Sequence, residues 1–226
     1  MNISGFLPLT LLDFPGRTAC TVFFSGCNLR CPFCHNAALI SGDAPQIGED
    51  AFFDFLRQRQ GLLDGVCVSG GEPLLQSDMA DFLRVIKGLG FEIKLDTNGT
   101  LPLRGLLGTG LVDYIAMDLK NSLAEYPKSV GVFKFNPEIL LDNIEALRGS
   151  GLEYEFRTTV VKGLHTSASL LDAAKLILPG EKWFLQQYKD SGNISGKGLS
   201  AFTSAEMESF RSKLARFVPS VQLRGI

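Results

Sequence analysis

The sequence predicts an α/β fold built on a largely parallel sheet. Short segments rich in Val, Ile, Phe and Tyr alternate with segments whose apolar residues recur at helical spacing. Alternation of this kind gives parallel strands joined by right-handed crossovers. The chain has 226 residues, 45% of them hydrophobic, and no linker, repeat or low-complexity tract. We therefore expect residues 1–226 to form one domain with a sizeable core.

Six segments are expected to be the strands of this sheet, because they are enriched in β-branched and aromatic residues. In chain order they are residues 18–24, 65–69, 92–96, 114–118, 154–161 and 182–187. Six strand–helix units do not fill a closed eight-stranded barrel.

Helices are expected between these strands. The first follows Gly48 and carries Phe52, Phe53 and Leu56 on one face, and another begins at Pro137, a residue that suits the first turn of a helix. The full set is residues 49–59, 78–88, 137–148, 167–178 and 204–217, with a weaker helix at 103–107.

Composition excludes several classes of partner. The net charge is −2 and the pI is about 5.7, so no basic field suggests nucleic acid. The N-terminus lacks a charged region followed by an apolar run, and no apolar run approaches the roughly 20 residues that span a bilayer. We expect a cytoplasmic protein with neither nucleic acid nor membrane as partner.

Three cysteines, Cys27, Cys31 and Cys34, form the pattern C-x-x-x-C-x-x-C. A structural zinc site wants four protein ligands, and so does an ordinary iron–sulfur cube. Three thiolates on a four-iron cluster leave one iron without a protein ligand, and that iron is able to bind a substrate-like molecule. A zinc site remains the alternative, whereas an odd cysteine count argues against a disulfide framework.

Other residues near the triplet have simpler interpretations. Cys20 and Cys67 lie in β-rich segments and are expected to be small buried hydrophobes. His35 directly follows Cys34, and adjacent side chains seldom converge on one metal, so we expect local packing for it. Arg30 is expected to be exposed or to act electrostatically, and His165 to have no catalytic role.

The triplet resembles the signature of the radical S-adenosylmethionine (SAM) superfamily, with Phe33 before the third cysteine and the ending Cys34-His35-Asn36. The resemblance covers essentially the whole chain and continues in Leu12-Asp13-Phe14-Pro15-Gly16-Arg17, Val68-Ser69-Gly70-Gly71-Glu72-Pro73, Asp96-Thr97-Asn98-Gly99, Met117-Asp118-Leu119-Lys120 and Leu223-Arg224-Gly225. Within the superfamily the chain is most similar to activating enzymes of glycyl radical enzymes, above all those of anaerobic ribonucleoside-triphosphate reductases.

This resemblance implies a partial, open β/α barrel of six units. Residues 3–6 and 221–224 would be short strand extensions at its two ends. Reactive groups in such barrels lie at the C-terminal ends of strands. Four motifs fall at such predicted ends: the cysteine loop, Gly70-Gly71-Glu72-Pro73, Asp96-Thr97-Asn98-Gly99 and Asp118 with Lys120.

The resemblance also implies roles for particular residues. Cys27, Cys31 and Cys34 would hold one 4Fe-4S cluster. Asp96, Thr97 and Asp118 are candidates for a monovalent cation beside SAM. The residues expected around SAM are Gly70, Gly71, Glu72, Asp96, Thr97, Asp118, Lys120 and Arg157.

The same residues have structural alternatives that the sequence leaves open. Gly70-Gly71 also suits a simple turn, Asp96-Thr97-Asn98-Gly99 an Asx turn, and Asp118 with Lys120 a structural pair. Arg157 lies in an apolar strand, where it suits either the SAM carboxylate or a core ion pair. Gln186 and Gln187 occupy the place where relatives carry a polar or histidine residue near adenine, and that contact stays open.

The implied reaction begins with a low-potential electron donor such as flavodoxin or ferredoxin. SAM is cleaved to methionine and a 5′-deoxyadenosyl radical, which takes a hydrogen from a glycine of the partner, expected to be anaerobic ribonucleotide reductase. Two alternatives remain. One is a radical SAM enzyme acting on a small metabolite, such as a deazapurine-pathway synthase, and the other is a zinc-binding module without enzyme activity.

Overall fold

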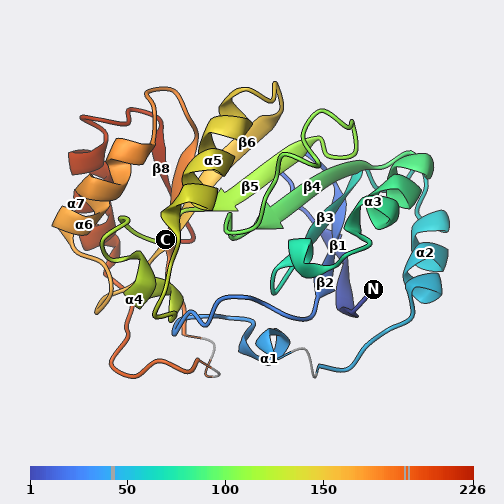
Figure 1. Cartoon of the computed structure of the whole chain (residues 1–226), viewed down its shortest axis with the longest axis horizontal. Helices are drawn as coiled ribbons and strands as arrows, with labels where there is room; N and C mark the ends of the chain where they lie inside the picture. The colour runs from blue at the N-terminus through green and yellow to red at the C-terminus, as the bar shows by residue number, and fades with distance from the viewer. Residues whose placement is uncertain (42–43, 191, 193) are drawn as a thin grey trace. The chain divides into compact units, whose positions relative to one another are not determined.

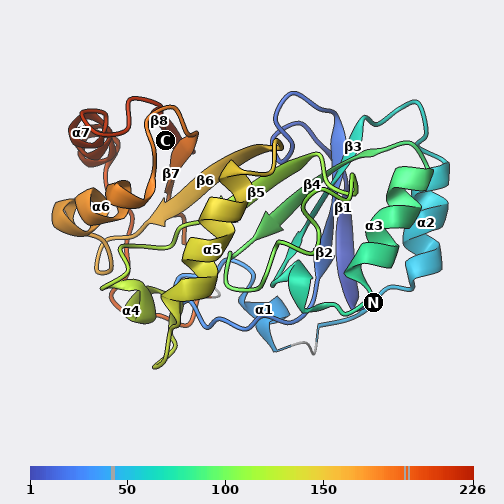
Figure 2. The same cartoon turned by 45° about the horizontal axis from the view of Figure 1, so that its top comes forward.

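The computed structural model describes residues 1–41, 44–190, 192 and 194–226 (Figures 1 and 2). The α/β class predicted from the sequence is confirmed. The chain divides into two compact units, and the boundary falls inside the cysteine loop, after Asn28. The first unit comprises Met1–Asn28, Ala38–Ala116 and Glu138–Glu153, and the second comprises Leu29–Ala37, Met117–Pro137 and Tyr154–Ile226. A single domain over residues 1–226 stays a prediction.

The sheet of the first unit follows the order of the chain. It is built from β1 (Ile3–Thr10), β2 (Ala19–Phe24), β3 (Gly65–Gly70), β4 (Glu92–Thr97) and the start of β5 (Tyr114–Asp118). β1 is antiparallel to β2, whereas β2, β3 and β4 are parallel, with Phe24 opposite Gly70 and Val68 opposite Leu95. The carboxyl ends of these parallel strands therefore share one edge of the sheet.

Aromatic side chains fill the core of this unit. α2 (Glu49–Arg57) and α3 (Met79–Gly88) lie side by side along its sheet (Figures 1 and 2). Phe82 is the central ring: Phe24 packs edge-on against it with ring centroids 5.2 Å apart, and Phe52 stacks on it at 5.8 Å. Because all three side chains are buried, this apolar cluster fixes the helices on the sheet.

The second unit contains three parallel strands, β6 (Glu153–Val160), β7 (Trp183–Gln187) and β8 (Val221–Arg224). α6 (Ser167–Ala173), which continues as the short 3-10 helix η2 (Ala174–Leu176), and α7 (Ser204–Leu214) lie beside these strands (Figures 1 and 2). In neither unit does the run of paired strands close on itself, which agrees with the partial barrel predicted from the sequence.

The structure corrects the sequence interpretation in the short elements. The weak helix expected at residues 103–107 is wrong: Gly105 interrupts the segment, Leu103 donates its backbone N–H to Asn143 Oδ1 at 2.9 Å, and only a turn forms. α7 ends at Leu214 rather than at Phe217. Three short helices were missed because they are too short to show a periodicity. They are α1 (Ala37–Ile40), α4 (Tyr126–Val130) and the 3-10 helix η1 (Pro73–Leu75).

The longer elements agree closely with the sequence interpretation. β5, β8 and α5 (Pro137–Arg148) have the predicted bounds, and β1 extends to Thr10 beyond the predicted residues 3–6. Within the described ranges, no helix is both long and apolar enough to cross a membrane.

Candidate active site

None of the three cysteines of the triplet forms a disulfide, and Cys31 is buried while Cys27 and Cys34 are half-buried. Over the residues that the structure describes, no group of three or more His, Cys, Asp or Glu side chains converges on the position of a single metal ion. A cluster takes one thiolate per iron, so its ligands need not converge on a single point. Three unbridged thiols in one short loop are a donor set that fits a four-iron cluster.

The Cys27 end of the loop is anchored through its neighbour Gly26. The Gly26 N–H donates to Leu39 O at 2.7 Å, and Gly26 O accepts from the Glu72 N–H at 2.8 Å. Gly26 has a φ of +93°, a backbone conformation that side chains disfavour. The turn that presents Cys27 is therefore fixed from two sides by main-chain hydrogen bonds.

The glycine pair Gly70-Gly71 brings the end of β3 against this loop. A side chain at Gly70 would overlap the backbone of Phe24, and one at Gly71 would overlap Gly26 O. The sequence predicted a close approach of this backbone to a ligand. In the structure the same absence of side chains allows the close approach of β3 to the backbone around Cys27.

Glu72 connects this segment to the end of β4. Its side chain is fully buried. Oε1 accepts from Thr97 Oγ1 at 2.9 Å and from the Leu74 N–H at 3.2 Å, and Oε2 accepts from the Asn98 N–H at 2.7 Å. Glu72 thus fixes the loop after β4, and its contact with SAM stays a prediction.

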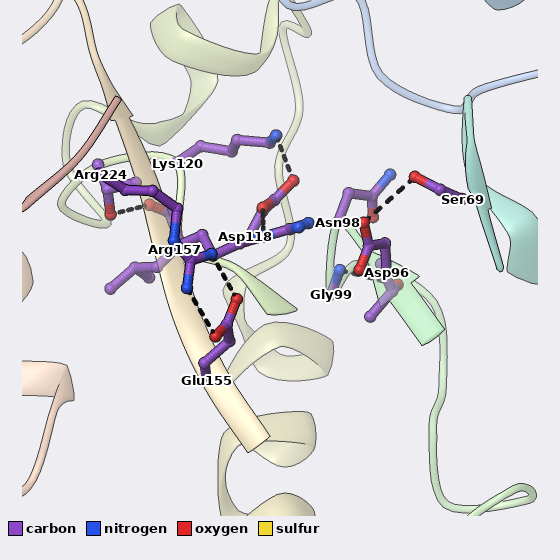
Figure 3. Close-up of polar contacts among 12 residues, drawn as sticks. Ser69, Asp96, Asn98, Gly99, Asp118, Lys120, Glu155, Arg157 and Arg224 are labelled. Atoms are coloured by element: carbon purple, nitrogen blue, oxygen red, sulfur yellow. Dashed lines mark hydrogen bonds and ion pairs between the residues drawn. The ribbon is translucent and has the colours of Figure 1, made fainter. Parts of the chain in front are cut away.

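Asp96 has a cationic partner that the sequence interpretation missed. Lys94 lies two residues earlier on β4, is 2% exposed, and forms an ion pair with the Asp96 carboxylate. Asp96 also accepts a hydrogen bond from Ser69 Oγ at 3.3 Å (Figure 3). Residues two positions apart in a strand lie on the same face. The spacing of Lys94 and Asp96 could therefore have predicted this ion pair.

The half of the loop that carries Cys31 and Cys34 is held by other segments. The Arg30 N–H donates to Val130 O, at the end of α4, and the Gly196 N–H donates to Pro32 O, both at 2.8 Å. The Arg30 side chain is exposed, as the simpler of its two interpretations predicted. Neither anchoring segment carries a recognisable motif, so these anchors could not be predicted from the sequence.

Aromatic contacts pack the residues beside these cysteines. Phe33 is buried, and the Lys120 ammonium lies 6.0 Å from the centroid of its ring. The ring of His35 lies 5.9 Å from that of Tyr188. Local packing predicted for His35 is therefore confirmed.

A charged cluster lies where β5 ends and β6 passes. Asp118 receives Lys120 Nζ at 2.6 Å and Arg157 Nε at 3.0 Å, while Glu155 receives both terminal nitrogens of Arg224 at 2.8 and 3.1 Å (Figure 3). In these contacts three cationic side chains face two carboxylates. Lysine and arginine side chains suit an anionic ligand such as a carboxylate.

Lys120 remains charged within this cluster. Burial works against its ammonium form, but the Asp118 carboxylate outweighs that effect and raises the pKa of Lys120 above its ordinary value. The sulfur of Cys31 raises this pKa further. Lys120 is thus a permanent positive charge whose field reaches one thiol of the triplet.

The other residues considered in the sequence analysis make contacts within the protein or lie in its core. His165 is buried, accepts the Val161 N–H on Nδ1 at 3.0 Å, and has Nε2 2.8 Å from Lys120 O. Gln187 donates to Phe202 O at 2.6 Å, and the sequence made no prediction of an adenine contact at Gln186 or Gln187. Cys20 and Cys67 are fully buried, as predicted.

Comparison with known proteins agrees with this geometry. The radical SAM superfamily profile matches residues 21–176. A protein of Methanocaldococcus jannaschii, provisionally named a glycyl-radical enzyme activating enzyme, is 29% identical over 99% of this chain and 96% of its own length. The anaerobic ribonucleoside-triphosphate reductase-activating protein of Escherichia coli is 31% identical over 38% of this chain and 58% of its own length. The crystal structure of QueE from Escherichia coli has a TM-score of 0.60 at 15% identity, over 99% of this chain and 93% of that chain.

The chain therefore belongs to the radical SAM superfamily, whose members use a 4Fe-4S cluster and SAM. Among the relatives, it resembles the activating enzymes of glycyl radical enzymes along nearly its whole length. The low identity to QueE bears on the fold alone.

Proposed function

We propose that this chain is a radical SAM activase that generates a glycyl radical on a partner enzyme, and that the partner is an anaerobic ribonucleoside-triphosphate reductase. The observation that carries the proposal is the similarity to the Methanocaldococcus jannaschii relative over 99% of this chain and 96% of that protein. The reductase is favoured by the name of the Escherichia coli relative.

The proposal assigns one role to the three cysteines and another to the charged side chains around Asp118. Cys27, Cys31 and Cys34 would hold the cluster and leave one iron without a protein ligand. Lys120 and Arg157, both held by Asp118, would bind the SAM carboxylate. With an electron from a reduced donor, bound SAM yields methionine and a 5′-deoxyadenosyl radical, which takes a hydrogen atom from a glycine Cα of the partner.

Other residues would shape the site without touching the reacting atoms. Gly70, Gly71 and Glu72 hold the backbone beside Cys27, where we propose that SAM binds. Asp96 and Thr97 end β4, and we propose at most a weakly held monovalent cation beside them, because Lys94 already pairs with the Asp96 carboxylate. We further propose a flavodoxin or ferredoxin as donor and the cytoplasm as location.

The decisive experiment mixes anaerobically reconstituted protein with the reductase, SAM and a strong reductant. We expect a persistent glycine-centred radical in the electron paramagnetic resonance spectrum. It should require SAM, reductant and each of Cys27, Cys31 and Cys34, and it should vanish when the reductase glycine is replaced by alanine. The matched controls are Cys20→Ala and Cys67→Ala, which remove buried thiols outside the triplet and should keep the signal.

A small-metabolite enzyme would behave differently. It would cleave SAM and consume a small molecule without leaving a radical on any candidate reductase. That result would reject the activase proposal and leave the radical SAM chemistry intact.

A further inference from the structure

Asn98 is a buried amide that the sequence interpretation assigned to no role. It follows β4, its side chain is 6% exposed, and its backbone N–H donates to Glu72 Oε2 at 2.7 Å. Its Nδ2 lies 4.0 Å from the sulfur of Cys27, at the outer limit of an N–H···S contact. An amide donor is therefore directed at one of the three thiols expected to ligate the cluster.

Hydrogen bonds decide which end of this amide faces Cys27. Asn98 Oδ1 accepts from the Thr100 backbone N–H at 2.9 Å and from Thr100 Oγ1 at 2.6 Å. A backbone N–H can only donate, so the atom that faces it must be the amide oxygen. Nδ2 then points the other way, towards Cys27.

A closed ring of hydrogen bonds holds the amide in this orientation. Asn98 Nδ2 donates to Asn28 Oδ1 at 2.9 Å, Asn28 Nδ2 donates to Thr100 Oγ1 at 2.8 Å, and Thr100 Oγ1 donates to Asn98 Oδ1. Each member both donates and accepts, so turning any one of the amides breaks two bonds of the ring. One proton of Asn98 Nδ2 is used by Asn28, and the second is directed at the sulfur.

We propose that Asn98 is a positioning and tuning residue for the cluster, which donates a hydrogen bond to the Cys27 sulfur and raises the reduction potential. Reduction places one further negative charge on the cluster and its thiolates. A donor beside a sulfur stabilises that charge more than it stabilises the oxidised form. This inference rests on membership of the superfamily and is independent of the identity of the protein partner.

The test is the midpoint potential of the reconstituted cluster, measured by redox titration with detection by electron paramagnetic resonance. Asn98→Ala removes the donor and should shift the potential to a more negative value. Asn98→Asp keeps the shape, replaces the donor by an oxygen and should shift the potential at least as far. Asn2→Ala removes an exposed amide from the same unit and should leave the potential unchanged.

Thr100→Val tests whether the orientation of the Asn98 amide matters, and not only its presence. It deletes the hydroxyl that closes the ring but leaves Asn98 and Cys27 in place, so we expect a smaller shift of the same sign. Iron and sulfide analysis of every variant measures cluster content separately from potential.

Two results would overturn the proposal. The first is an unchanged potential in Asn98→Ala and Asn98→Asp with the full cluster retained. The second is loss of the cluster in both Asn98 variants together with an unchanged potential in Thr100→Val, since Asn98 would then only maintain the structure of the loop.

Discussion

Arg157 on β6 donates from Nε to Oδ1 of Asp118 at the end of β5, with the two atoms 3.0 Å apart. Both side chains are largely buried, at 14% and 20% exposure, and Asp118 also holds Lys120. One carboxylate thus holds two cationic side chains. We propose that these cations also face the SAM carboxylate, and a purely structural role for Arg157 is the alternative.

Arg157→Ala is expected to weaken SAM binding by about 10- to 100-fold, because a charge-assisted hydrogen bond contributes roughly 1.5–3 kcal/mol. Equilibrium binding of SAM to the reconstituted protein measures this. The matched control is Arg104→Ala, which removes an exposed arginine that is also paired with an aspartate, Asp142. Equal affinities of Arg157→Ala and the unchanged protein would restrict Arg157 to a structural role.

Alanine variants of the triplet should lose bound iron, whereas alanine variants of the two isolated cysteines should keep it. Anaerobic reconstitution should give about four irons and four sulfides per chain, and alanine at Cys27, Cys31 or Cys34 should abolish the cluster. Cys20→Ala and Cys67→Ala should retain it, because both side chains are fully buried in β-strands. Stoichiometric zinc without sulfide would contradict the cluster assignment.

Thiol reactivity offers an independent measurement on the same residues. Burial raises the pKa of Cys20 to about 12, so this thiol is protonated at neutral pH. In folded protein without cluster, we expect iodoacetamide at pH 8 to modify the half-exposed Cys27 and Cys34 well before Cys20. Peptide mass spectrometry identifies the order, and early labelling of Cys20 would show that β2 opens readily.

Lys94 pairs with the Asp96 carboxylate, so a monovalent cation is less needed to balance the charge of Asp96. We expect 5′-deoxyadenosine formation by the unchanged protein to vary less than about twofold when sodium and potassium are replaced by tetramethylammonium. Lys94→Met leaves Asp96 without its buried partner, which is strongly unfavourable, and activity should then depend on the cation. Lys87→Met breaks the half-buried pair with Asp113 and serves as control. A strong cation requirement before any substitution would contradict the idea.

Because His165 is buried, we expect the folded protein to lose stability in mild acid. Burial lowers the pKa of its imidazole below the ordinary value of about 6.5. As the pH falls through 6.5, the unfolded chain binds a proton that the folded chain does not, so the free energy of unfolding decreases until the lower folded pKa is passed. Urea unfolding between pH 7.5 and pH 5 measures this slope.

His165→Gln should flatten that slope, because it removes the group that titrates. His35→Gln is the matched control, since it makes the same substitution at the exposed histidine. An identical pH dependence in the unchanged protein and in His165→Gln would assign the effect to other groups.

The chain's sequence by itself determined the features that depend on neighbours in the chain. The spacing of Cys27, Cys31 and Cys34 is local, because all three lie in one loop of eight residues. Strand positions followed from runs of β-branched and aromatic residues, and the longer helices from their periodicity. The α/β class and the superfamily were therefore predictable without a structure.

The tertiary structure decided which side chains meet across large separations in sequence. Asn98 meets Asn28 from 70 residues away and Glu72 from 26 residues away, and Arg224 meets Glu155 across 69 residues. No spacing rule gives such partners, because strand register and loop anchoring set them only after the chain has folded. The short α4 that anchors the cysteine loop was likewise invisible, since five residues show no helical period. The thiols could thus be predicted from the sequence, whereas the hydrogen bonds around them come from the fold.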